Sequence, residues 1–193
     1  MIIVALAGRR IDAPDTQKPS FPLENTEKVR RCMSELFTKH QVSTLVCSAA
    51  CGADLLALEV AGDLGLRRRI VLPFERDRFR EISVIDRPGN WGALFDRIYS
   101  EVEAAGDLVI LHKSDQDEAA FLAANQGIFE EARLLAHSTA NKQKTAENSF
   151  EDKILAVIVW DGKPRGEGAA DMTAGFMHEA RRQGFPVAEI LTL

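Results

Sequence analysis

The sequence predicts an α/β protein, a Rossmann-like three-layer sandwich with a mainly parallel sheet. Continuous apolar runs at 2–7 (IIVALA), 70–72 (IVL) and 154–160 (ILAVIVW) are typical of strands buried on both faces of a parallel sheet. Amphipathic helical patterns alternate with these runs, which favours βαβ units. The chain of 193 residues is long enough for one well-buried domain, so we expect a single domain over residues 1–193.

Each further element follows from a local pattern. Residues 25–40 place Val29, Met33 and Phe37 at helical spacing, which predicts an amphipathic helix after the first strand. The polar stretch 138–151 has no such spacing and predicts a loop. The remaining expected elements are strands at 45–47, 107–111 and 186–191 and helices at 54–64 and 117–136.

Composition argues against several classes of protein. A net charge of −5 argues against general nucleic-acid binding. No segment approaches the length of a membrane span, and the first apolar run is too short for a signal sequence, so we expect a cytoplasmic protein without a membrane partner. Cys32, Cys47 and Cys51 lack the spacing of a metal site, so we expect no metal and no cofactor.

The loop after the second strand is the main candidate for ligand binding. A helix N-terminus leaves backbone N–H groups unpaired, and small side chains leave them uncovered, so such a loop suits an anionic or phosphate-bearing ligand. A turn that only packs is the alternative, because any βαβ unit needs small residues at this point. The candidate residues are Ser48, Ala49, Ala50, Cys51, Gly52 and Asp54.

Two arginines follow the first strand directly. Gly8 ends that strand, and Arg9 and Arg10 stand at the edge where open α/β sheets collect their ligands. Arg10 is the natural partner for a phosphate or carboxylate, since a guanidinium offers fixed donors in a fork. A solvated pair of loop arginines is the alternative. Residues 13–23, which contain three prolines, predict a loop over this edge.

A second glycine-bearing turn follows the strand at 154–160. Gly166 and Gly168 precede Asp171 and a helical pattern, as the first loop does, and Trp160 closes the strand before them. Because parallel strands end at the same edge of a sheet, we expect the two turns to lie near one another.

The middle of the chain offers weaker candidates. Pro73 closes the third strand and Arg76 opens a charged stretch. Trp91 and Phe95 could stack on a ring-bearing ligand or form the core face of a helix, and for Phe95 we prefer the core. Asn125 is either a base or ribose contact or an exposed or capping amide.

These segments together resemble the SLOG superfamily, the Rossmann-like group that includes DprA/Smf and the LOG phosphoribohydrolases. The resemblance rests on GRRID after the first strand, SAACGADLLALE after the second, PFERDRF, and WDG with a later GEGAAD. It extends over about residues 2–190 and is nearest to bacterial members with GHR-type first loops, often fused to effector modules.

The resemblance implies a domain that binds nucleotides or their derivatives at the C-terminal edge of its sheet. It places the family's three loops at Gly8 to Arg10, Ser48 to Asp54 and Gly166 to Asp171. Arg9 stands where relatives commonly have His, and Ala169 and Ala170 replace a Gly-Thr pair. The PGGxGTxxE motif of the LOG enzymes is absent.

We therefore expect binding or sensing of a nucleotide-type small molecule. The alternative is an N-glycosidic hydrolase or transferase, LOG-like or deoxyribosyltransferase-like, and the sequence leaves the choice between enzyme and sensor open. Cleavage of that bond needs a carboxylate beside the anomeric carbon, by analogy with glycoside hydrolysis. The candidates are Glu75, Glu130, Glu131 and Asp171. A homo-oligomer also stays open.

Overall fold

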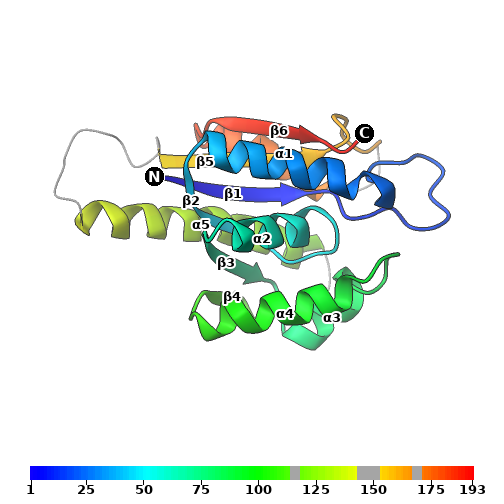
Figure 1. Ribbon diagram of the computed structural model, residues 1–193, viewed down its shortest axis with the longest axis horizontal. Coiled ribbons are helices and arrows are strands. Elements are labelled where there is room, and N and C mark those ends of the chain that lie inside the picture. The colour runs from blue at the N-terminus through cyan, green and yellow to red at the C-terminus, as the bar shows by residue number, and fades with distance from the viewer. Residues whose placement is uncertain (114–117, 143–152, 167–170) are drawn as a thin grey trace.

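The computed structural model describes residues 1–113, 118–142, 153–166 and 171–193. Their strands form one six-stranded sheet in the order β4-β3-β2-β1-β5-β6, and every neighbouring pair is parallel (Figure 1). The predicted Rossmann-like α/β class is therefore confirmed. The strands are β1 (Ile2–Gly8), β2 (Val42–Cys47), β3 (Arg67–Leu72), β4 (Leu108–Ile110), β5 (Ile154–Trp160) and β6 (Val187–Leu191).

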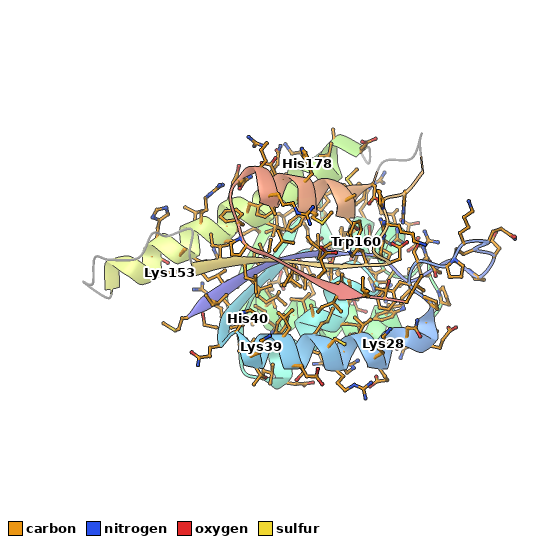
Figure 2. The ribbon with its side chains drawn as sticks, turned by 90° about the horizontal axis from the view of Figure 1, so that it is seen from above. Lys28, Lys39, His40, Lys153, Trp160 and His178 are labelled. Atoms are coloured by element: carbon orange, nitrogen blue, oxygen red, sulfur yellow. The ribbon has the colours of Figure 1, made fainter. Side chains whose placement is uncertain are left out.

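Helices cover both faces of the sheet. Figure 2 shows α1, with Lys28 and Lys39, on one side of the sheet and α6, with His178, on the other. α2 and α4 pack with α1 on the first face, and α5 packs with α6 on the second. The helices are α1 (Thr26–Lys39), α2 (Ala53–Asp63), α3 (Arg76–Ser83), α4 (Trp91–Ala104), α5 (Glu118–Lys142) and α6 (Met172–Arg182), with a short 3-10 turn at Leu23–Asn25.

The strand order places a ligand crevice beside β1. From β1 the chain builds outward through β2, β3 and β4, and it then returns along α5 to add β5 and β6 on the other side of β1. Such a reversal leaves a crevice at the carboxyl ends of the strands, because the helices on either side of that point lie on opposite faces. The polar residues that follow β1, β2 and β5 therefore meet at one edge.

Burial explains why these segments adopt these elements. β5 is buried at all seven of its positions, and β1 at its five central ones, as expected for central strands covered by helices on both faces. α2 lies between α1 and α4 and is apolar on nearly all sides, with eight of its eleven residues buried. On the other face Phe129 and Phe176 stack with 4.2 Å between ring centroids. The crevice therefore rests on a close-packed frame.

The structure corrects two expectations about local structure. The predicted loop 138–151 is wrong for its first five residues, because α5 continues to Lys142; the rest of the predicted loop, residues 143–151, lies outside the described part. A polar segment can extend a helix that is already formed, since adding a residue costs far less than nucleation. Trp91 and Phe95 are buried in the core face of α4, so the core alternative holds for both.

Within the described part of the chain, no helix combines the length and the apolar character that crossing a bilayer demands.

Candidate functional site

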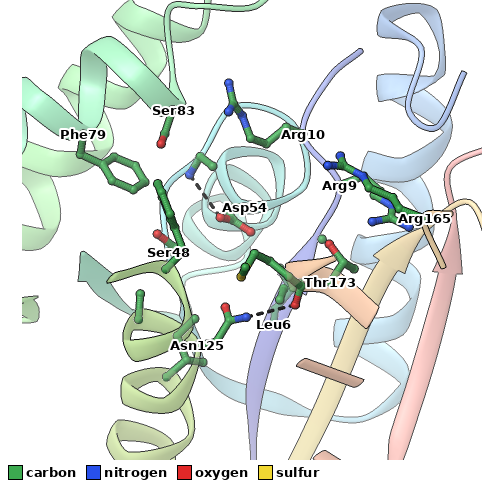
Figure 3. Close-up of a pocket in the computed structure, with 17 residues that line it drawn as sticks. Leu6, Arg9, Arg10, Ser48, Asp54, Phe79, Ser83, Asn125, Arg165 and Thr173 are labelled. Atoms are coloured by element: carbon green, nitrogen blue, oxygen red, sulfur yellow. Dashed lines mark hydrogen bonds between the residues drawn. The ribbon is translucent and has the colours of Figure 1, made fainter. Parts of the chain in front are cut away.

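A cavity of about 230 Å³ lies at the C-terminal edge of the sheet, in the crevice that the topology predicts (Figure 3). Its floor comes from the end of β1, and its walls come from the β2–α2 loop, α3, α5 and the start of α6. The lining residues are Leu6, Ala7, Gly8, Arg9, Arg10, Ser48, Ala50, Asp54, Phe79, Ser83, Phe121, Ala124, Asn125, Ile128, Arg165, Met172 and Thr173.

The cavity combines apolar walls with a few polar groups. Phe79 and Phe121 come from α3 and α5 and supply aromatic surface. The hydroxyls of Ser48, Ser83 and Thr173 make no side-chain hydrogen bond with any described residue. Such a lining is typical of a small-molecule site, in which apolar contact gives affinity and a few polar groups fix orientation.

Asn125 enters the cavity from α5. Its Nδ2 donates to the backbone oxygen of Met172 at 3.1 Å, which fixes the amide and leaves the side-chain oxygen facing the cavity (Figure 3). Asn125 therefore lies among the lining residues, and its contact with a base or a ribose stays a prediction. An anchored amide oxygen is suited to accept a hydrogen bond from an amino group or a hydroxyl.

Asp54 is the one carboxylate among the described residues that line this cavity. It lies in the first turn of α2, only 7% exposed, and burial raises its pKa to about 7 against the opposing effects of the Ala50 N–H and Arg10. Its Oδ2 accepts from the Ala50 backbone nitrogen at 3.2 Å. A carboxyl poised near neutral pH in a cavity is able to give or take a proton and to bind hydroxyl groups.

The expected row of free amides in the β2–α2 loop is largely occupied by the protein itself. The Ala50 nitrogen donates to Asp54, the Cys51 nitrogen to Ser83 O at 2.9 Å, and the Ala53 nitrogen to Arg9 O at 3.1 Å. The prediction that this loop cradles phosphate through these amides is therefore wrong for Ala50, Cys51 and Ala53. The loop reaches the cavity through the side chains of Ser48 and Asp54 instead.

Close packing accounts for two of the predicted glycines. A Cβ on Gly8 would lie 2.3 Å from the Ala53 Cβ and 2.8 Å from Val159 O. Gly52 has a φ of +98°, and a Cβ there would lie 2.8 Å from the Ile11 nitrogen. Only glycine lets β1, β5 and the start of α2 approach so closely. Gly52 does not line the cavity, so for this residue the alternative of a turn that only packs holds.

Arg9 ties the two glycine-bearing turns together. Its guanidinium is 2% exposed and donates to Asp161 at 3.0 Å, to both carboxylate oxygens of Asp171 and to Lys163 O. It also lies over the Trp160 ring, 5.9 Å from the centroid. The residues that flank the second turn, Arg165 and Thr173, line the same cavity as Ser48, as expected. Most donors of Arg9 are already used, so it holds the crevice in shape.

Asp171 acts with Arg9 and at the start of α6. It caps this helix by accepting from the Ala174 nitrogen, and it also accepts from the Arg165 nitrogen. Burial alone would raise its pKa, but the hydrogen bonds from Arg9, Ala174 and Arg165 outweigh burial and hold it at about 2. Asp171 is therefore a permanent anion beside the cavity and does not line it.

Two other cations remain at the rim. Arg10 pairs with Asp86 and lines the cavity, and its buried Nε has no partner among the described residues. Arg165 lines the cavity as well, and its guanidinium is exposed and unpaired within the described ranges. The Arg10 side chain is 29% exposed and Arg165 is exposed, so these two lining guanidiniums have donors to spare for an anionic ligand.

The structure separates the other predicted residues from the cavity. Arg76 pairs with Asp96 at 2.9 Å, and Trp160 donates to Glu189 at 2.8 Å. Burial raises the pKa of the Cys51 thiol, as for a packed side chain. Gly168 lies outside the described residues, and Gly166 lies beside a second pocket. The predicted site residues that do not line the cavity are Ala49, Cys51, Gly52, Pro73, Arg76, Trp160, Gly166 and Asp171.

The remaining catalytic candidates also lie elsewhere. Glu75 faces His112 at 2.7 Å, Glu131 pairs with Arg69 at 2.6 Å, and Glu130 is exposed. No cluster of described residues has the composition of a metal site. Asp54 was predicted as a ligand-binding residue and not as a catalytic one, because its burial is invisible in the sequence.

Sequence reasoning missed several lining residues. Phe79, Phe121 and Thr173 belong to helical patterns that look like core positions, and only the pairing of α3, α5 and α6 around the crevice turns them toward one space. A signal did exist for Arg165, which stands in the loop after β5 at the same strand edge as Arg9 and Arg10.

Comparison with known proteins finds a similar solved structure and no matching family model. The chain is similar to the X-ray structure of DNA processing protein A (DprA) from Streptococcus pneumoniae, with 14% sequence identity and a TM-score of 0.43. The similarity covers 97% of this chain and 58% of DprA, so the chain spans less than two thirds of that protein. No protein-family model and no curated protein matches the chain.

Proposed function

We propose that this chain is a single domain that binds a nucleoside or a nucleotide-derived small molecule in the cavity beside β1. The observation that carries the proposal is the cavity itself, which lies at the switch point of the sheet. Its volume of about 230 Å³ lies just below the range of about 300–1,000 Å³ usual for drug-sized ligands, which favours a small ligand.

The lining supplies what a nucleoside needs. Phe79 and Phe121 offer aromatic surface for a base. Asn125 and Ser48 offer hydrogen bonds for the edge of the base, and Asp54 can accept from sugar hydroxyls. Arg10 and Arg165 line the cavity and reach solvent, so they suit a 5′-phosphate that projects out of it.

Binding of nucleosides and nucleoside monophosphates is expected to raise the melting temperature. At a ligand concentration of about 100 times the Kd, binding adds about 2.7 kcal/mol to the free energy of unfolding, which corresponds to about 5–10 °C. Thermal unfolding with the common nucleosides and their monophosphates measures this shift. The proposal fails if none of them shifts the transition and none gives heat of binding in calorimetry.

A matched pair of variants tests the location. Asn125→Ala removes the oxygen that faces the cavity and is expected to weaken binding about 2- to 13-fold, since a hydrogen bond contributes about 0.5–1.5 kcal/mol. Gln126→Ala changes the next residue of the same helix, which is exposed and does not line the cavity, and should bind as the unchanged protein does. Equal affinities of the two variants would place the ligand elsewhere.

An N-glycosidic hydrolase or transferase is the second candidate, and Asp54 favours it. A carboxyl whose pKa is about 7 could act as an acid or base at a glycosidic bond held in the cavity. Such an enzyme would release free base from a nucleoside or nucleotide, and Asp54→Asn would slow the release by at least about 100-fold. Chromatography of the ligand after incubation with the protein distinguishes cleavage from binding. If the ligand stays intact, the hydrolase or transferase function is wrong and only binding remains.

A further inference from the structure

A second pocket of about 840 Å³ opens beside the cavity, and the two share Arg10 and Arg165. We infer that it holds the phosphate chain of a nucleoside 5′-diphosphate or triphosphate whose nucleoside part occupies the cavity. The inference rests on the proposed function and extends it to the class of ligand. The shared arginines lie at the point where the first phosphates would cross from one space to the other.

The charge of this pocket favours an anion. The lining residues and the residues joined to them by ion pairs, directly or through Arg9, comprise six basic side chains and four carboxylates, in a protein whose net charge is −5. Lys18, Lys163 and Arg165 are exposed there, and their side chains have no partner among the described residues. Several unpaired cations facing one space create a field that attracts a polyvalent anion.

The carboxylates near this pocket are already used. Asp12 accepts from the Ser20 nitrogen at 2.9 Å and from the Phe21 nitrogen at 2.9 Å. Asp161 accepts from Arg9, and Asp86 pairs with both Arg10 and Arg87. Since Asp12, Asp161 and Asp86 each have a partner, none of these three needs the free lysines, which remain available to phosphate oxygens. Asp15, which is exposed in the same loop, does not line the pocket.

The wall of the pocket is fixed without a ligand. Besides the Asp12 bonds, the Asp12 nitrogen donates to Phe21 O at 3.0 Å, which closes the loop of residues 13–20 at its base. The Thr192 hydroxyl donates to Ser20 O and holds the loop against the end of β6. A loop held at its base presents Lys18, which lines the pocket, with a smaller loss of chain entropy on binding than an untethered segment would have.

The lining also distinguishes a phosphate chain from a second nucleotide. None of the described residues that line the second pocket is aromatic, whereas Phe79 and Phe121 line the cavity. A second base would need a surface on which to stack, and single-stranded nucleic-acid sites supply one. A phosphate chain needs only cations and small donors, which Lys18, Lys163 and the Thr16 hydroxyl provide.

The test compares ligands that share one base, by calorimetry in the absence of divalent cations. The triphosphate is expected to bind at least about tenfold more tightly than the nucleoside, because its extra phosphates reach the unpaired cations. The double variant Lys18→Glu with Lys163→Glu should lose this gain and keep the affinity for the nucleoside within twofold. Lys39→Glu is the control, since Lys39 is exposed near the opposite end of the sheet (Figure 2).

The outcomes separate the two proposals. Nucleoside and triphosphate of equal affinity would overturn the phosphate pocket and leave the nucleoside cavity in place. A third outcome is that no nucleoside binds, that inorganic tripolyphosphate does bind, and that the double variant loses this binding of tripolyphosphate. This result would support the phosphate pocket and overturn the proposed function. A dinucleoside monophosphate that binds as tightly as the triphosphate would overturn the choice of a phosphate chain.

Discussion

Arg9→Ala is expected to lower the free energy of unfolding by about 3–5 kcal/mol, because it removes one partner of a buried ion-pair network. Asp171 and Asp161 would lose their guanidinium, and both are mostly shielded from water. The turn after β5 would also lose the bond between Arg9 and Lys163 O. Denaturant unfolding followed by circular dichroism measures the change.

Arg165→Ala is the matched control for this variant. Arg165 follows the same strand as Asp161, but its guanidinium is exposed and has no partner among the described residues, so its loss should cost less than about 0.5 kcal/mol. If Arg9→Ala proves too unstable to purify, Arg9→Lys keeps one charge and should fall between the two. A stable Arg9→Ala protein that fails only in ligand binding would contradict the structural role given to Arg9.

Asp54→Asn is expected to stabilise the protein at high pH. The pKa of Asp54 is about 7 when folded against about 3.9 for a free aspartate, so the folded state holds its proton more tightly. Stability is therefore lost as pH rises from about 4 to about 7, and the full cost above pH 7 is about 4 kcal/mol. Asparagine carries no charge and can still accept from the Ala50 nitrogen.

The measurement is chemical unfolding of both proteins across this pH range. The variant should be more stable by about 4 kcal/mol at pH 8 and by only about 1 kcal/mol at pH 4.5. If the free energy of unfolding of the two proteins changes with pH in the same way, water in the cavity keeps the Asp54 carboxylate hydrated. The pKa of Asp54 would then not be raised, and the proposed acid–base role of Asp54 would be wrong.

Asp171 is expected to change the stability with pH in the opposite direction to Asp54, so it serves as a comparison within the same protein. Its pKa of about 2 lies below that of a free aspartate, so its ionised form stabilises the fold above about pH 4, and this stability is lost as pH falls toward 2. Asp171→Asn should therefore cost about 2 kcal/mol at pH 7. Two aspartates beside one cavity thus respond oppositely to pH, because Asp54 is desolvated without a strong partner and Asp171 receives donors from Arg9 and two backbone nitrogens.

How far the site could be predicted depends on the kind of residue. Gly8, Arg10, Ser48 and Asp54 stand directly after β1 and β2, and the rule that parallel strands present their carboxyl ends at one edge brings them together. Phe79 could not be found in this way, because its helix carries no sequence mark of which side faces the crevice. Phe95 presents the same pattern as Phe79 and lies in the core.

The order of the strands along the chain and the buried runs of β1 and β5 were determined by the sequence alone, because hydrophobic periodicity is a local property that each segment carries with it. The helix at Arg76–Ser83 was not predicted. What the tertiary structure decided is which groups remain free. Arg9 and Arg10 are neighbours with the same chemistry, yet the turn after β5 surrounds Arg9 with Asp161 and Asp171 and leaves Arg10 at the opening. The ion pairs and burial of Arg9, and the pKa of Asp171, depend on contacts between residues more than 150 positions apart in the sequence. No local sequence pattern contains that information.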